Sequence, residues 1–187
     1  MDTFLLTFLL VIAVSLGGRD QLVVARLSDA LEQSWSLLVV GALVCVASAG
    51  MMTLAGATLA DVLPPQAADM LIAFALAIAA FELYWPVRLK AMEEPTRSLG
   101  AVGIVLLARQ LGDAARFVIF ALAAEATYPS VTVVGGALGG FAALALGWTM
   151  GVELEAKVPL RPIRLALGTC LIFAALLIGL NARYAFW

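Results

Sequence analysis

Histidine is absent from the sequence, and charged residues are scarce. Asp, Glu, Lys and Arg together make up 13% of its 187 residues, against about 25% in a typical soluble domain. Without an imidazole, the chain has no histidine ligand for zinc and no histidine general base. Hydrophobic residues account for 64% of the chain, and the mean hydropathy is +1.05. We therefore predict an all-α, polytopic membrane protein whose main partner is the lipid bilayer.

Cysteine is also rare, and no catalytic signature is present. Cys45 and Cys170 each lie within an apolar run, where each is expected as a small hydrophobic residue buried in lipid and not as half of a disulfide. The sequence has no Gly-x-Ser-x-Gly, no pair of catalytic aspartates and no histidine cluster for a metal. We therefore expect no enzyme activity, no cofactor and no nucleic-acid partner. Because the N-terminal residues carry no basic cluster, the segment from Phe4 onward is expected to be a membrane span and not a cleaved signal peptide.

Long apolar stretches dominate the sequence. A helix needs about 20 apolar residues to cross a bilayer, and six stretches are long enough. They cover approximately residues 4–27, 36–60, 67–85, 101–124, 131–151 and 163–182. The connections between them are short, so we predict six transmembrane helices and no separate soluble domain.

The basic residues between the predicted spans are distributed unevenly. Seven lie in or beside the first, third and fifth connections, none lies in the second or fourth, and Arg183 is near the C-terminus. The seven are Arg26, Arg88, Lys90, Arg97, Lys157, Arg161 and Arg164. Because cytoplasmic connections are enriched in Lys and Arg, we predict that the odd connections face the cytoplasm. Both termini are then outside, in a protein of the bacterial inner (plasma) membrane.

Two of the predicted spans carry polar residues near their middle. The first contains Ser-Leu-Gly-Gly-Arg-Asp-Gln at residues 15–21, and the fourth contains Arg-Gln-Leu-Gly-Asp-Ala-Ala-Arg at residues 109–116. Charges at that depth cost several kcal/mol, so they need a partner, a cavity or a function. Gly17, Gly18 and Gly112 are expected to act as hinges or as points of close packing.

The two halves of the chain repeat each other. A shift of 95 places residues 15–18 on residues 110–113, and a shift of 94 aligns two series of small residues spaced by four. The first series is Gly41, Cys45, Ala49, Thr53 and Ala57, and the second is Gly135, Gly139, Ala143, Gly147 and Gly151. Residues at this spacing share one helical face, on which another helix can pack closely. We expect the second and fifth spans to pack together through Gly139 and Gly147.

Three spans per half is an odd number, so the two halves must have opposite orientations. We predict a first three-helix repeat over residues 1–90 and an inverted second repeat over residues 98–187, within one membrane domain. Inverted repeats with polar, glycine-interrupted segments at matching midplane positions are typical of secondary transporters.

At the two interrupted segments the chain resembles a known family. It is similar to the two-repeat membrane proteins of the lysine-exporter superfamily that carry Glu-x-Gly-Asp-(Lys/Arg)-(Thr/Ser) once in each half. That family includes the Golgi manganese/calcium transporter and bacterial manganese exporters. The resemblance covers nearly the whole chain, and it implies six spans and the exchange of a divalent cation for protons.

The motif of that family is only partly matched. In the first copy Gly17 and Arg19 match, whereas Ser15, Gly18 and Asp20 stand at the positions of the glutamate, the aspartate and the hydroxyl residue. In the second copy Gly112 and Asp113 match, and the positions that differ are Gln110, Ala114 and Ala115. A glutamine that often follows the motif is matched by Gln21 and replaced by Arg116.

These two segments supply the candidate substrate site. Hard cations such as Mn²⁺ and Ca²⁺ prefer carboxylate and other oxygen ligands, so Asp20 and Asp113 are the candidate metal ligands. The neutral oxygen donors are Ser15, Gln21 and Gln110, and the candidate counter-charges are Arg19, Arg109 and Arg116. The spacing of Arg109, Asp113 and Arg116 is that of one helical face.

Several alternatives stay open on the sequence alone. The charges can form a buried ion-pair cluster with a purely structural role, or the arginines can hold an anionic or zwitterionic solute. The protein can also be a membrane adaptor that transports nothing. Glu82, near the end of the third predicted span, is either a solvated interface residue or a gating carboxylate.

Overall fold

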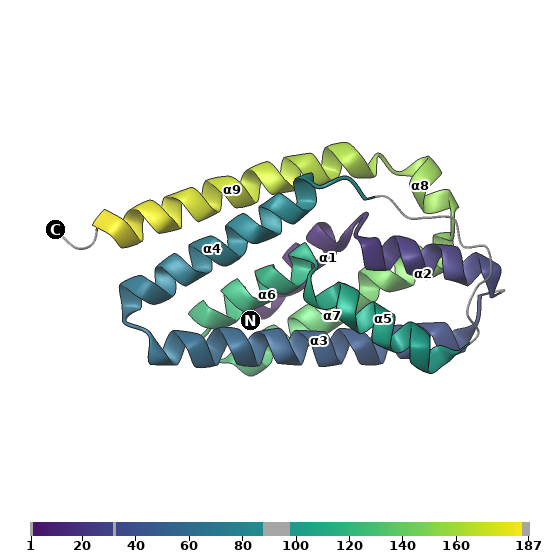
Figure 1. Ribbon diagram of the computed structural model, residues 1–187, viewed down its shortest axis with the longest axis horizontal. Helices are drawn as coiled ribbons and strands as arrows, with labels where there is room; N and C mark the ends of the chain where they lie inside the picture. Colours follow the sequence, from purple (N-terminus) through teal and green to yellow (C-terminus); the bar gives the residue numbers. More distant parts are fainter. Residues whose placement is uncertain (1, 32, 88–97, 185–187) are drawn as a thin grey trace.

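The computed structural model describes residues 2–31, 33–87 and 98–184, most of which lie in helices (Figure 1). The helices are α1 (Asp2–Ser15), α2 (Arg19–Ala30), α3 (Trp35–Val62), α4 (Pro65–Tyr84), α5 (Leu99–Leu111), α6 (Ala114–Glu125), α7 (Pro129–Met150), α8 (Glu153–Lys157) and α9 (Leu160–Tyr184). The described part of the chain contains no strand. The predicted all-α class is confirmed.

Four helices, α3, α4, α7 and α9, are long and apolar enough to cross a membrane. The pair α1 and α2 makes a fifth span if it is counted as one, although the pair is bent by 66°. In place of the predicted span 101–124 there are two shorter helices, α5 and α6, separated by Gly112 and Asp113. By length and composition, the described residues therefore form an integral membrane protein with four or five candidate spans. The predicted count of six is not confirmed.

Proline and glycine set several of the helix ends. Pro65 and Pro129 lie in the first turns of α4 and α7, where the missing N–H has no helical partner to lose. Gly151 follows α7 with a φ of 54°, a left-handed conformation that glycine adopts without strain. A Cβ at this position would also lie 2.7 Å from Cγ of Asp29. The chain can therefore turn sharply at Gly151 only because no side chain is present.

The broken segment of each half packs against the other half. Helices α1 and α2 lie against α7, and α5 and α6 lie against α3. Helices at equivalent positions also pack together, α3 with α7 and α4 with α9, and the last pair runs side by side in Figure 1. Most contacts made by a helix of one half are therefore also made by the corresponding helix of the other half. An exception is the contact of α4 with α6, which has no strong counterpart between α9 and α2.

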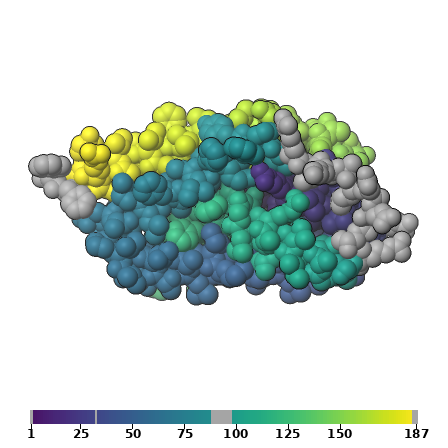
Figure 2. Space-filling view, in the orientation of Figure 1, coloured from purple at the N-terminus to yellow at the C-terminus, as the bar shows by residue number. Residues whose placement is uncertain are grey.

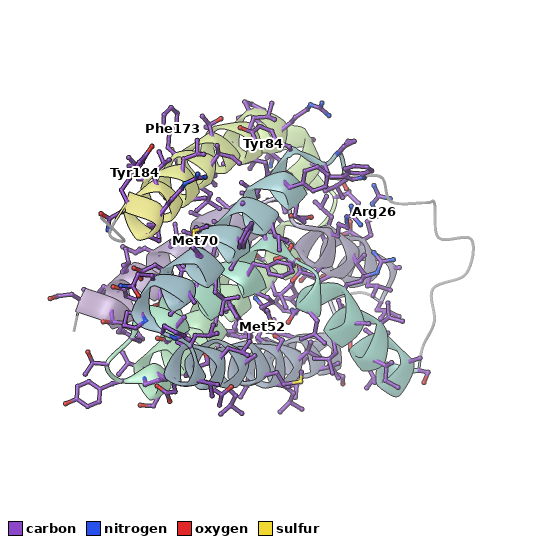
Figure 3. The ribbon with its side chains drawn as sticks, turned by 60° about the vertical axis from the view of Figure 1, so that its left-hand side comes forward. Arg26, Met52, Met70, Tyr84, Phe173 and Tyr184 are labelled. Atoms are coloured by element: carbon purple, nitrogen blue, oxygen red, sulfur yellow. The ribbon has the colours of Figure 1, made fainter. Side chains whose placement is uncertain are left out.

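The outer surface of the bundle is rich in large apolar side chains. Leu43, Leu54 and Ile104 are each at least 66% exposed. Phe173 and Tyr184 project from α9 away from the other helices (Figure 3). Apolar side chains exposed on several long helices fit contact with lipid tails.

Part of the predicted cytoplasmic charge lies at one end of the bundle. Arg26, in the second half of α2, forms an ion pair with Glu155 of α8 at 3.1 Å. Lys157 donates a hydrogen bond to the exposed carboxylate of Glu153, which lowers the pKa of that carboxyl group. Arg164, in contrast, lies within α9 and is buried, so it is not a connection residue. The predicted connection residues Arg88, Lys90 and Arg97 lie outside the described residues.

The small-residue series of α7 permits close contact, but not with the expected helix. A Cβ added to Gly139 would lie 2.7 Å from the carbonyl oxygen of Phe8, and one added to Gly147 would lie 2.8 Å from that of Gln21. Phe8 belongs to α1 and Gln21 belongs to α2. The expectation that Gly139 and Gly147 contact the second predicted span is therefore wrong. The neighbouring Gly140 faces α3 and α6 instead.

Replacing Gly139 by leucine is expected to lower the free energy of unfolding by about 1–3 kcal/mol, because the new side chain must displace the backbone of α1. Gly50 on α3 is the matched control, since no atom lies within 4 Å of the position of its added Cβ. Gly50→Leu should leave the free energy unchanged or raise it, because leucine favours a helix more than glycine does. Titration with SDS in mixed micelles measures both values. Equal destabilisation of the two variants would contradict the contact between α1 and α7.

Candidate substrate site

The first predicted span bends at Gly17 and Gly18. Gly17 has a φ of 70°, which residues with a side chain rarely adopt. The N–H of Gly17 donates to Oε1 of Gln21 at 2.7 Å, and the N–H of Gly18 donates to the carbonyl oxygen of Ser15 at 3.0 Å. Asp20 consequently lies in the first turn of α2, where the helix dipole favours a negative charge.

The second break places Asp113 at the start of α6. Its Oδ2 accepts a hydrogen bond from the N–H of Ala115 at 3.3 Å, which caps the helix. The side chain is buried, with 5% exposed, and its Oδ1 has no hydrogen-bond partner in the described part of the chain. A buried carboxylate oxygen without a donor is unusual and requires an explanation, such as a ligand that binds there.

The two carboxylates lie beside the same face of Gly18. A Cβ added to Gly18 would be 2.9 Å from Oδ1 of Asp20 and 3.4 Å from Oδ1 of Asp113. The carbonyl oxygen of Ser15 would be 3.0 Å away. Three oxygens from two breaks thus converge on a glycine, which has no side chain to fill the space between them. The structure therefore brings together the two acids that the sequence selects as candidate ligands.

Gln110 connects Asp20 to Arg116. Its Nε2 donates to Oδ2 of Asp20 at 3.1 Å. Its Oε1 accepts hydrogen bonds from the hydroxyl of Ser48, at 2.8 Å, and from the guanidinium of Arg116. Nε of Arg116 also donates to the oxygen of Ser48 at 2.8 Å. A buried polar network therefore runs from α2 through α5 to α3 and α6.

Arg116 is fully buried without a direct ion pair. Its side chain is 0% exposed, and none of the ion pairs among residues 2–31, 33–87 and 98–184 includes it. Its Nη1 has no hydrogen-bond partner among these residues. The carboxylate of Asp20 balances its charge from a greater distance, through the Gln110 amide.

The expectation that Arg109, Asp113 and Arg116 share one helical face is wrong. The helix is broken between Leu111 and Ala114, so the residues before and after the break do not follow one helical phase. Arg109 is exposed at the end of α5, whereas Arg116 points into the buried network. The two arginines consequently have different environments and different capacities to bind a ligand.

The three residues predicted to supply neutral oxygen ligands differ in how far their side chains are already engaged in hydrogen bonds. Nε2 of Gln21 donates to the carbonyl oxygen of Ala143 at 2.7 Å, and its Oε1 is bound by Gly17, so Gln21 braces α2 against α7. The amide of Gln110 is occupied by the network described above. Ser15 is buried, and its hydroxyl oxygen has no hydrogen-bond partner within the described residues. Of these three residues, Ser15 is therefore the one whose side-chain oxygen is not already used in a hydrogen bond within the described residues.

An open cavity of about 640 Å³ borders Asp113. Its charged lining residues are Arg19, Glu82, Arg109 and Asp113, and the remainder consists mainly of apolar side chains from α4, α5 and α6. In Figure 2, purple atoms of the N-terminal segment are visible between α4 and the α5–α6 segment, which are the elements that line this cavity. Arg19 and Arg109 can therefore meet a solute in the cavity, and Arg116 cannot.

Glu82 is a site residue whose role the sequence left open. Its side chain is 14% exposed, so it is not a solvated interface residue. Oε2 accepts a hydrogen bond from Nη2 of Arg164 at 3.0 Å, and Oε1 lies 4.0 Å from Nε of Arg19. The signal in the sequence is a lone acid within an apolar stretch. The sequence alone could not pair it with Arg164, which is 82 residues away.

The arrangement provides oxygen ligands for a hard cation. Around Gly18, Asp20 and Asp113 supply carboxylate oxygens and Ser15 supplies its carbonyl oxygen, which are ligand types that Mn²⁺ and Ca²⁺ accept. The described residues contain no group of three or more Cys, Asp or Glu side chains that could hold a metal. The candidate ligands are therefore two acids and neutral oxygens.

Comparisons with protein-family models, curated proteins and solved structures found no match. The resemblance to cation exchangers stays a prediction from the two interrupted segments, and the function is inferred from the site itself.

Proposed function

We propose that this protein is a secondary transporter that exchanges a divalent cation of the Mn²⁺ or Ca²⁺ type for protons. The observation that carries the proposal is the convergence of Asp20 and Asp113 on Gly18. Each acid lies where a helical segment is broken, and the two breaks come from different halves of the chain. Broken helices that meet near the midplane are the usual position of a transporter site.

The electrostatics of two neighbouring carboxylates suit exchange. Two negative charges close together in a medium of low dielectric constant repel each other, so a positive charge between them is strongly favoured. A divalent cation neutralises Asp20 and Asp113 together, and protons bound to the same oxygens have the same effect. Because both ligands use the same oxygens, binding of one displaces the other. This competition couples the two fluxes.

The proposed transporter has six spans in two inverted halves, residues 1–90 and 98–187. Helices α5 and α6 together form its fourth span, as α1 and α2 form its first. Support comes from the matching contacts of the two halves. Helices α1 and α2 of the first half pack against α7 of the second, and α5 and α6 of the second half pack against α3 of the first. Movement of one half against the other would expose the site to each side in turn.

Both termini of the proposed transporter face the outside of the bacterial inner membrane. The test uses the two ends of α7 in a Cys170→Ala background, which removes the exposed native cysteine. In intact cells an impermeant maleimide should label Tyr128→Cys, where Tyr128 is 72% exposed, and should not label Val152→Cys, where Val152 is 56% exposed. Labelling of position 152 but not of position 128 would show the opposite orientation.

A second candidate substrate is an anionic or zwitterionic solute. The specific observation is that Arg19 and Arg109 both line the cavity next to Asp113 and are exposed to it. Guanidinium groups bind carboxylates and phosphates through paired hydrogen bonds. For such a substrate Arg109→Gln should abolish uptake. For a cation the same change should leave the flux intact, because it removes a repelling charge.

Purified protein in proteoliposomes tests the proposed function directly. With an Mn²⁺-sensitive dye inside the vesicles and a pH gradient across them, Mn²⁺ should enter while protons leave, at rates that protein-free vesicles do not reach. Ca²⁺ and small organic anions are measured in parallel. Flux of an anion alone would favour the second candidate substrate. Absence of flux for every solute would favour a membrane adaptor that transports nothing.

A further inference from the structure

A second cavity, of about 380 Å³, lies where α4 ends and α9 begins. Its lining includes Trp85, which directly follows α4, and Arg161 and Arg164 from the first turns of α9. In Figure 1 the end of α4 lies near these turns. Asp20 and Asp113 do not line this cavity. It is therefore separate from the candidate substrate site.

Arg164 brings an unsatisfied hydrogen-bond donor to this cavity. Its side chain is 5% exposed, and its Nη2 donates to the carboxylate of Glu82 at 3.0 Å and to the carbonyl oxygen of Glu82 at 3.1 Å. Its Nη1 has no hydrogen-bond partner among residues 2–31, 33–87 and 98–184. The side chain passes Gly17, another lining residue, because a Cβ added to Gly17 would lie 3.3 Å from Cδ of Arg164. A buried donor of this kind requires an explanation, and an acceptor that enters the cavity would satisfy it.

The charges around the cavity favour an anion. Its charged lining residues are Arg161, Arg164 and Glu155. Arg164 is balanced by Glu82 and Glu155 is balanced by Arg26, whereas the exposed Arg161 forms no ion pair within the described part of the chain. The N-terminus of α9 adds partial positive charge, because the N–H groups of a first turn have no helical acceptor. Two guanidiniums beside a helix N-terminus suit a phosphate group.

The cavity lies at the depth expected for lipid headgroups. Helices α4 and α9 are both long and apolar enough to cross a membrane, and one ends where the other begins. Tyr84 and Trp85 line the cavity and are 40% and 54% exposed, and such residues concentrate at the membrane–water interface. Leu83 and Leu165 give the lining an apolar part, which suits the start of an acyl chain. Basic pockets between transmembrane helices near the membrane surface bind the headgroups of anionic lipids.

We propose that this cavity binds the phosphate group of an anionic membrane lipid. One phosphate oxygen accepts a hydrogen bond from Nη1 of Arg164, and the guanidinium of Arg161 supplies the excess positive charge. Because Arg164 also bonds to Glu82 and packs against Gly17, the bound lipid joins α4, α9 and the break between α1 and α2. This site does not depend on whether the protein transports a cation.

The test titrates the purified, delipidated full chain in detergent with dioleoyl phosphatidylglycerol, and native mass spectrometry gives the Kd. Dioleoylglycerol has the same acyl chains without the phosphate and should bind at least about tenfold more weakly, because it makes no charged hydrogen bond. Arg164→Gln should raise the Kd for phosphatidylglycerol about tenfold, and Arg161→Gln should raise it about fivefold. Arg183→Gln, which removes an exposed arginine near the other end of α9, should have the wild-type Kd.

Three results would overturn the proposal. The first is a wild-type Kd in both Arg161→Gln and Arg164→Gln, and the second is dioleoylglycerol binding as tight as that of phosphatidylglycerol. The third is an equal rise of the Kd in Arg183→Gln, which would show only a non-specific attraction between the lipid and surface charge. If Arg164→Gln does not fold, Arg164→Lys replaces it. Lysine keeps a charge for Glu82 but has no second nitrogen to reach the phosphate, so the Kd should still rise, and a wild-type Kd overturns the proposal.

Inorganic phosphate distinguishes the two sources of a phosphate group. Added at the same concentration as phosphatidylglycerol, it should leave the Kd of the lipid unchanged, because it lacks the acyl chains that hold the lipid at the membrane surface. Displacement of phosphatidylglycerol by inorganic phosphate would show that the ligand is a soluble phosphate, and the assignment to a lipid would be wrong.

Discussion

Replacing Asp113 by asparagine is expected to reduce Mn²⁺ flux in proteoliposomes to the level of protein-free vesicles. Asparagine has nearly the same shape, and its side-chain oxygen can still cap α6 by accepting the hydrogen bond from Ala115. The charge is lost, and with it one of the two carboxylates that converge on Gly18. Because the cap is retained, the free energy of unfolding should stay close to the wild-type value. A loss of flux is then attributable to the site.

Glu125→Gln is the matched control for this experiment, because it removes an acid from the exposed end of the same helix. Its flux should equal that of the wild type. Wild-type flux in Asp113→Asn would mean that Asp113 does not bind the cargo, and the proposed site would then be wrong.

Replacing Arg116 by methionine is expected to lower the free energy of unfolding by about 3–5 kcal/mol, the usual cost of removing one partner from a buried charged network. Methionine fills much of the same volume, so a cavity contributes little. The change removes the donors to Ser48 and Gln110 and leaves the charge of Asp20, which is 4% exposed, without compensation. Titration with SDS in mixed micelles measures the difference.

A double-mutant cycle tests whether Arg116 acts through Asp20. Adding Asp20→Asn removes the uncompensated charge, so the double variant should regain part of the loss, with a coupling energy of at least about 0.5 kcal/mol. Arg19→Met is the control, since the Arg19 side chain is 45% exposed and should contribute less than about 1 kcal/mol. Strictly additive effects of Arg116→Met and Asp20→Asn would show that the Gln110 amide does not couple the two charges.

The positions of the two breaks were predictable from the sequence. Glycines next to charges inside an apolar stretch oppose a continuous helix, and the repeat placed Gly18 and Asp113 at matching points. The structure breaks the helices at residues 16–18 and 112–113. The proximity of Asp20 to Asp113 follows from the same match.

The direction of the side chains beyond a break was not predictable. Helical periodicity relates Arg109 to Arg116 only if the helix continues, and the break at residues 112–113 resets the phase, so one arginine is exposed and the other is buried. The helix that packs against the small-residue series of α7 was also not predictable from the sequence. Small residues mark a face that another backbone can approach, but they do not specify which helix approaches it. Because α5 and α6 are each too short to cross a membrane alone, the predicted count of six spans is not confirmed.

The packing of α1 and α2 against α7 has a consequence for the order in which the chain folds. Their partner begins at Pro129 and ends at Met150, so most of the sequence must be synthesised before these contacts can form. At about 5–20 residues per second, the interval between completion of α2 and completion of α7 is roughly 6–24 s. During that interval the Arg19–Asp20 segment lacks the complete α7, and until α5 has been made it also lacks the amide of Gln110. We therefore expect this segment to stay in the insertion machinery or at the membrane surface at first, and to enter the bilayer only after α7 has been made.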